Sequence, residues 1–208
     1  MLIITLTKMA EDITLNEVLQ NLSNGWNLSK SSITSSLANH QGIGVELMRT
    51  NVEMCKTVYD LSESDPEFSE FTLQENWNLL FHYWAEGNFL LGEHNAKLVL
   101  ESMKDLQLGI LSYKEQQGQY GDGVMPNMMT FDPATTSKYL QYVDASVIHY
   151  SEVMEIHRIS TDKGLHLDDS FRDSSKQHID DLLSYAQNVA VANEEKWFLD
   201  KYFPPTQG

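Results

Sequence analysis

The sequence is poor in cysteine, proline and basic residues, and each shortage limits what the protein can be. Its single cysteine, Cys55, excludes an intrachain disulfide and suits a reducing compartment. Only five prolines in 208 residues leave room for long helices, because proline breaks helix interiors. The 14 lysines and arginines face 30 acidic residues, so the net charge is −16 with histidine neutral.

The shortage of basic side chains argues against bare nucleic acid and anionic membranes as partners, since both attract cationic surfaces. The acid is uneven: the net charge is −2 over residues 1–60, −8 over residues 61–131 and −6 over residues 132–208. A basic protein partner is compatible with this surface. The simpler alternative is that the charge only keeps the protein soluble.

Long apolar runs are also missing. No run approaches the roughly 20 residues of a membrane-spanning helix. The apolar start, residues 1–8, lacks the positive region and the length of a secretory signal. We therefore expect a soluble, cytoplasmic protein without a constitutive membrane span.

The sequence does contain apolar residues at helical spacing. Steps of three and four predict two long helices, residues 15–61 and 72–119, joined by a polar loop that contains proline. A shorter helical hairpin follows, with helices at residues 133–159 and 169–201. In the first helix, a break between Asn24 and Lys30 or near Gly42 is the alternative to one continuous helix.

These elements predict an all-α fold, an elongated antiparallel helical bundle longer than a compact globule of this size. We expect a single domain over residues 1–208, with tails at residues 1–12 and 202–208. A turn at Asp65 and Pro66 would place Cys55 opposite Trp77, and Leu22 opposite Ile110.

Glycine and polar residues gather at the middle of this predicted pairing. We call this set the glycine-rich level: His40, Gly42, Gly44, Gly87, Asn88, Gly92 and Asn95. Glycine inside a helix costs about 1 kcal/mol relative to alanine, so the set asks for a reason. Close approach of the two helices is the favoured interpretation, and a hinge and a ligand pocket are the alternatives.

No catalytic motif is present. The sequence lacks Gly-x-Ser-x-Gly, a phosphate-binding glycine loop and the Glu-x-x-His pairs of di-metal bundles. Three histidine–acid pairs share helix faces, but chance surface pairs are the better explanation in so acidic a chain: His82 with Glu86, His149 with Glu152, and His178 with Asp181. We predict no catalytic, cofactor-binding or metal-binding residue, no cofactor and no enzymatic activity.

Two further groups have structural explanations. Cys55 is expected to be an inert buried thiol. Asp168, Asp169 and Asp173 could attract a cation but lack the spacing and the glycine of an EF-hand loop, so we expect them to stabilise the N-terminus of the last helix through its dipole. His157 is expected to be a hydrogen-bonded core or edge residue.

Three classes of function remain. The preferred one is a non-enzymatic acidic interaction protein that binds or inhibits a basic protein partner, or is a subunit of a larger assembly. Its partner-binding residues would be Glu63, Asp65, Glu67 and Glu70, in and beside the first loop. The second class is a protein that coats an apolar surface or inserts into a membrane, of the granule-coating or pore-forming type. The third is a metal-binding helical-bundle enzyme.

Self-association is a further expectation. Two long helices cannot be covered along their whole length by two shorter ones, so an apolar stripe should stay exposed. Such stripes usually bind a partner, often a second copy of the chain. We therefore expect a homo-oligomer or a complex subunit.

Overall fold

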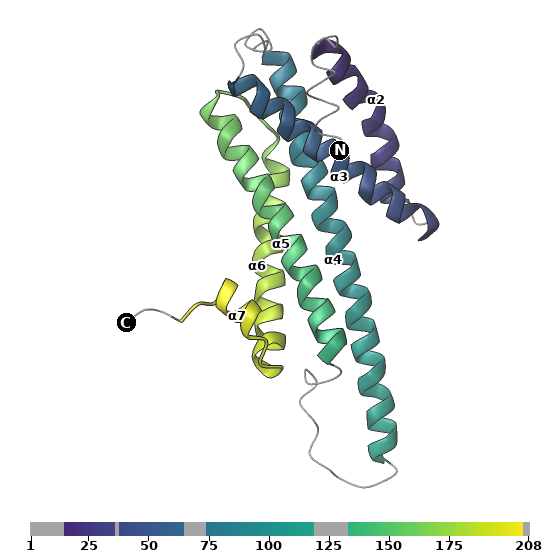
Figure 1. The fold of residues 1–208 in the computed structure, drawn as a ribbon. Helices are drawn as coiled ribbons and strands as arrows, with labels where there is room; N and C mark the ends of the chain where they lie inside the picture. The colour runs from purple at the N-terminus through teal and green to yellow at the C-terminus, as the bar shows by residue number, and fades with distance from the viewer. Residues whose placement is uncertain (1–14, 36–37, 65–73, 119–132, 206–208) are drawn as a thin grey trace. The chain divides into compact units, whose positions relative to one another are not determined.

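The computed structural model describes residues 15–35, 38–64, 74–118 and 133–205, and its regular secondary structure in these ranges is entirely helical. The helices are α2 (Leu15–Thr34), α3 (Ala38–Ser64), α4 (Gln74–Gly118), α5 (Pro133–Asp162), α6 (Asp169–Ala192) and α7 (Lys196–Tyr202) (Figure 1). The predicted all-α, antiparallel bundle is confirmed. Proline is the first residue of α5, where its missing N–H costs nothing.

Contacts divide the chain into two compact units. Unit 1 comprises residues 1–91 and 152–172, and unit 2 comprises residues 92–151 and 173–208. Helices α4, α5 and α6 each contribute to both units. The expectation of a single domain over residues 1–208 stays a prediction.

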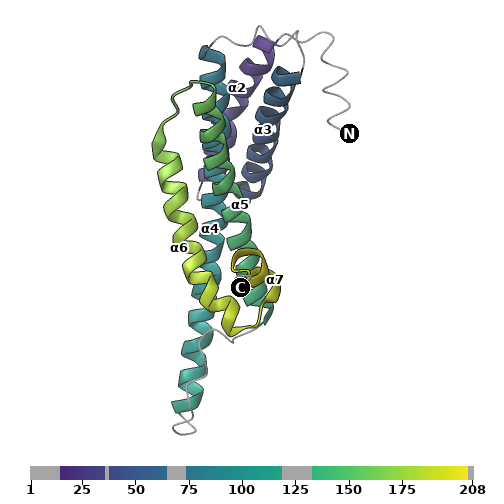
Figure 2. The ribbon, with the colours of Figure 1, turned by 90° about the vertical axis from the view of Figure 1, so that its left-hand side faces the viewer.

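In unit 1, the predicted first long helix is two helices. Helix α2 ends at Thr34, and α3 begins at Ala38 and packs alongside α2 (Figures 1 and 2). The pair is antiparallel, because Gly44 lies against the backbone of Ile33 whereas Asn51 donates a hydrogen bond to the earlier Ser29. The break therefore falls between the two positions that the sequence suggested.

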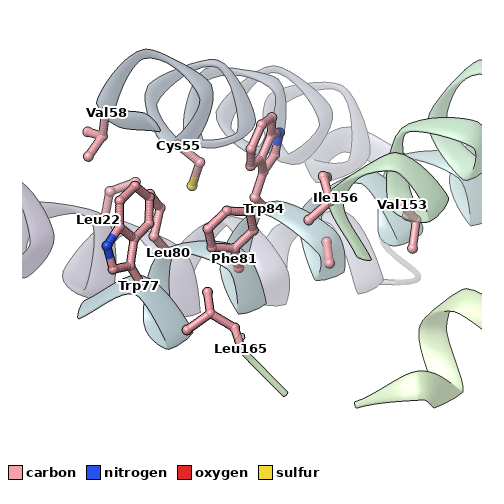
Figure 3. Close-up of a cluster of buried hydrophobic side chains, with 11 residues drawn as sticks. Leu22, Cys55, Val58, Trp77, Leu80, Phe81, Trp84, Val153, Ile156 and Leu165 are labelled. Carbon is pink, nitrogen blue, oxygen red and sulfur yellow. The ribbon is translucent and has the colours of Figure 1, made fainter. Parts of the chain in front are cut away.

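This reversal corrects the predicted position of Leu22. Its side chain is completely buried in one cluster with Cys55 and Leu80, far along α4 from Ile110. The pairing of Leu22 with Ile110 is therefore wrong. The predicted proximity of Cys55 and Trp77 is confirmed, since both belong to this cluster (Figure 3).

The core of unit 1 is built on the helical spacing of apolar residues in α3 and α4. These helices are antiparallel: the Tyr59 ring lies 5.9 Å from the Trp77 ring, while the earlier Val52 lies against the later Gly87. The core cluster is Leu22, Cys55, Val58, Trp77, Leu80, Phe81, Trp84, Ala85, Val153, Ile156 and Leu165 (Figure 3). Burial of one large apolar side chain contributes about 1.5–3 kcal/mol.

A glycine turn ends α5 in unit 1. Gly164 has a φ of 72°, and its N–H donates to the Thr161 carbonyl at 2.9 Å. The Leu165 N–H donates to the Ser160 carbonyl at 2.9 Å, which completes a Schellman motif. The motif turns Leu165 into the core cluster.

Asp168 starts α6. Its Oδ1 accepts a hydrogen bond from the Ser170 N–H at 2.9 Å, and this bond lowers the pKa of the Asp168 carboxyl. The interpretation of Asp168 as a stabiliser of the helix N-terminus is confirmed.

In unit 2, α5 and α6 are antiparallel. The Tyr139 ring lies 6.2 Å from the Tyr185 ring, and the Tyr150 ring lies 5.1 Å from the ring of the earlier His178. The buried cluster of this unit contains Val99 from α4 and Val143 from α5, together with residues of α6 and α7.

The predicted fourth helix, residues 169–201, is also two helices. The chain turns at Glu194, which has a φ of 55°, and the Glu195 N–H donates to the Ala190 carbonyl at 2.9 Å. The turn lets Phe198 of α7 enter the buried cluster. Helix α7 lies beside α5 (Figure 2), where Lys201 and Tyr202 donate to Asp144 at 2.5 and 2.6 Å.

Candidate functional site

An apolar groove in unit 2 has both aromatic and charged side chains in its lining. It has a volume of about 420 Å³, within the range of small-molecule sites. One wall is α4, which contributes Glu93, Ala96, Lys97 and Leu100. These positions follow the i, i+3, i+4, i+7 spacing of a single helix face.

The opposite wall is α6, with the same spacing: His178, Asp181, Leu182 and Tyr185. Tyr139 and Tyr150 of α5 are almost fully buried and also line the groove. By contrast, Leu100 and Tyr185 are 58% and 44% exposed, so both walls present apolar surface to solvent.

Burial controls the chemistry of the two α5 tyrosines. It raises the pKa of Tyr150, and the charge of Glu93 raises it further. Burial likewise raises the pKa of Tyr139, with a smaller contribution from Tyr185. Both hydroxyls therefore stay protonated near neutral pH and are unsuited to act as bases.

Unit 1 contains a second polar constellation around Glu86 of α4, which is only 7% exposed. The Trp26 indole N–H donates to Glu86 Oε2 at 3.0 Å, and the Lys30 ammonium donates to Oε1 at 2.5 Å. His82 Nε2 lies 3.6 Å from Oε2. Both oxygens of Glu86 accept hydrogen bonds from α2, so this carboxylate has a structural role: it joins α2 to α4.

The two asparagines of the predicted glycine-rich level are buried, and Asn88 donates to the Trp84 carbonyl at 3.1 Å. A side chain added at Gly44 would strike the backbone of Ser32 and Ile33. Each glycine has its own surroundings: Gly87 lies under Val52 and Trp26, Gly92 under Tyr150, and Gly42 beside open space.

Gly44, Gly87 and Gly92 thus each allow a close approach, but to different helices: Gly44 to α2, Gly87 to α2 and α3, and Gly92 to α5. The predicted approach of a single pair of helices is wrong for Gly44 and Gly92. The hinge and the pocket at this level stay predictions. His40 lies on α3. Gly92 and Asn95, the two of these residues that belong to unit 2, do not line its groove.

The predicted acidic tip is described at one of its four residues. Glu63, near the end of α3, accepts a hydrogen bond from the Lys163 ammonium at 2.5 Å. That ammonium also lies 4.8 Å from the centre of the Trp77 ring. Asp65, Glu67 and Glu70 lie outside the described residues, and the partner-binding role of the tip stays a prediction.

The other chemically reactive residues have structural surroundings. Cys55 is fully buried, and burial raises the pKa of its thiol to about 12, as suits an inert core residue. His157 is buried, with Nδ1 4.0 Å from Asp169 Oδ1. Within the described ranges, no three histidine, cysteine or acidic side chains come together as a metal site.

His178 and Asp181 were predicted only as a chance surface pair, and the groove was not predicted. A signal was present, because residues 93–100 and 178–185 each carry charged and apolar side chains on one face. Nothing in the sequence, however, shows that these two faces oppose one another.

Comparison with protein-family models, with curated proteins and with solved structures gives no match to this chain. In the part of the chain that the structure describes, no helix is both long and apolar enough to span a membrane.

Proposed function

We propose that this chain is a non-enzymatic interaction protein whose acidic surface binds a basic protein partner, either as a separate binder or inhibitor or as a subunit of an assembly. The observation that carries the proposal is the engagement of its arginine side chains. All three arginines hold carboxylates of the same chain: Arg49 with Glu46, Arg158 with Glu155 and Asp162, and Arg172 with Asp169.

The acidic side chains are in excess of these partners. Exposed carboxylates without an ion pair include Glu53 and Asp60 of α3 and Asp180 of α6, all within the described residues. A surface whose arginines are already engaged and on which anions are in excess attracts a cationic partner over a distance of about 10 Å at moderate salt.

The position of binding follows from the charge of the chain. Residues 61–131 carry the largest surplus of acid, and Asp65, Glu67 and Glu70 follow directly after α3. The proposal therefore places the partner at this acidic tip. Self-association and a cytoplasmic location belong to the same proposal, the latter supported by the single cysteine, Cys55.

The test uses a labelled lysine- and arginine-rich helical peptide as the probe, with a glutamate-substituted version of it as the negative control. Fluorescence anisotropy should show saturable binding of the basic peptide that weakens by about tenfold or more between 50 and 500 mM salt, concentrations that span strong and weak screening by the solvent ions. Binding that is unchanged by salt would contradict the proposal.

A pair of matched variants tests the position. The tip variant D65N/E67Q/E70Q should weaken binding by about tenfold, because it removes three charges from the proposed surface. The control D180N/E194Q/D200N removes three charges from unit 2 and should change the affinity by about twofold or less. Equal losses in both variants would show that the peptide senses only net charge.

A further inference from the structure

The groove of unit 2 combines a closed floor with an open mouth. Its floor is formed by the buried rings of Tyr139 and Tyr150, and its walls are single faces of α4 and α6. Ala96, a small residue, lines the wall on α4, and Leu182 lines the wall on α6. This is the geometry of a preformed site for a small, largely apolar molecule.

Tyr185 gives the lining an exposed aromatic ring, at 44%, whereas Tyr139 and Tyr150 are each 1% exposed. Tyr185 and His178 on α6 lie against Tyr139 and Tyr150, with ring centres 6.2 and 5.1 Å apart. Tyrosine rings have a negative face that attracts organic cations, most strongly where water is excluded. A planar apolar body with a positive group matches this lining.

Charge on the two walls favours the same ligand. Glu93 is half-buried on α4, and its charge helps to raise the pKa of Tyr150. Asp181 stands on the opposite wall, where its Oδ1 accepts a hydrogen bond from Gln177 at 2.9 Å. Lys97 also lines the wall on α4 but is exposed, and its long side chain lets the ammonium reach water.

We infer that this groove binds a small aromatic cation, an arylalkyl ammonium ion whose ring packs on Tyr185 and the apolar wall residues and whose positive group lies between Glu93 and Asp181. The inference goes beyond the proposed protein–protein function and does not depend on it, since the groove is separate in sequence from residues 63–70.

Three probes of one shape and different charge test the ligand class: naphthylmethyl-trimethylammonium, naphthylmethanol and naphthylacetate. Titration calorimetry on the full chain should show one saturable site that binds the cation about tenfold more tightly than the neutral alcohol, a difference on the scale of a desolvated cation–π contact. The acetate should bind most weakly. Tighter binding of the acetate, which would assign the site to Lys97, or no saturable binding of any probe, would overturn the inference.

Variants locate the site. E93Q and D181N should each weaken cation binding by about threefold to tenfold, by loss of a partly screened charge. The matched control D180N removes a neighbouring exposed charge that does not line the groove and should leave the affinity unchanged. If D180N weakens binding as much as D181N, the attraction is general and the inference fails.

A filling variant checks the shape. A96F should abolish cation binding by occupying the space between the walls. Circular dichroism melting establishes that the variant is folded. If A96F does not fold, L182A serves instead. This variant removes an apolar side chain from the lining and should weaken binding of both the cation and the alcohol. Binding of the basic peptide at the acidic tip should survive all of these changes, so failure here is distinguishable from failure of the proposed function.

Discussion

Glu86 of unit 1 is a carboxylate that is almost completely buried. A nearly buried carboxylate is tolerable only when its charge is compensated, since removal from water costs several kcal/mol. Lys30 and the Trp26 indole supply that compensation, and both come from α2. The Trp26 ring is also stacked on Tyr83 at 4.6 Å, so charge and packing fix the same helix to α4.

Loss of Lys30 alone should therefore lower the free energy of unfolding more than loss of both charges of the Lys30–Glu86 pair. We expect K30M to lower the free energy of unfolding by about 1–3 kcal/mol, because Glu86 keeps its charge while the 46% exposure of the Lys30 side chain limits the effect. The double variant K30M/E86Q should recover part of this loss, since glutamine still accepts the Trp26 hydrogen bond without carrying charge. Urea denaturation of the single and double variants measures the coupling.

The exposed pair Arg49–Glu46 provides the control for that cycle. Both of its side chains are mostly in water, and its coupling energy should be about 0.5 kcal/mol or less. A coupling between Lys30 and Glu86 no larger than this control would show that the buried pair does not fasten α2.

At the scale of elements, the packing of α2 on α3 depends on a missing side chain. An ideal Cβ at Gly44 would lie 2.5 Å from the Ile33 nitrogen and 2.5 Å from the Ser32 carbonyl carbon. These are backbone atoms and cannot turn aside, so any larger residue must push the two helices apart. Gly42, one half-turn earlier, has nothing within 4 Å of its Cβ position.

The two glycines therefore make a matched pair. G42A should raise the free energy of unfolding by about 0.5–1 kcal/mol, because alanine favours the helix and meets no neighbour. G44A gains the same helix propensity but should lower the net stability by about 1–3 kcal/mol through overpacking. Thermal and urea melts of both variants measure the difference, and a G44A protein as stable as G42A would contradict the close approach.

The break between α2 and α3 shows what apolar spacing can and cannot predict. Val18, Leu22, Trp26 and Ile33 continue in steps of three and four into α3, so the period alone indicates one helix. The reversal is set by tertiary contacts, the burial of Leu22 with Cys55 and of Gly44 on Ile33. The ends of α4 and the start of α5 were predictable because turn-forming residues and Pro133 mark them.

The second break, between α6 and α7, had no local signal. Glu194 takes a left-handed conformation that glycine usually supplies. The burial of Phe198 and the contacts of Lys201 and Tyr202 with Asp144 compensate for it. The groove was unpredictable for the same reason, because it depends on which faces of α4 and α6 oppose each other.

At the scale of the whole molecule, the net charge of −16 opposes self-association and favours binding of a basic partner. Two copies of the chain repel each other, and added salt screens that repulsion. A basic partner is attracted, and the same salt weakens the attraction. The dependence on salt thus separates two interactions that the proposal attributes to one protein.

An apolar stripe on α3 is the best candidate surface for self-association in unit 1. Ile43 and Leu47 are 61% and 37% exposed and share one helix face at i, i+4. We expect sedimentation analysis to show more oligomer at high salt than at low salt, and I43Q/L47Q to shift the protein to monomer at both. The control I148Q/V191Q changes two exposed apolar residues on different helices of unit 2 and should leave the oligomer intact. A protein that remains monomeric in high salt would show that this stripe is ordinary exposed surface, and then only the acidic surface would remain to recruit a partner.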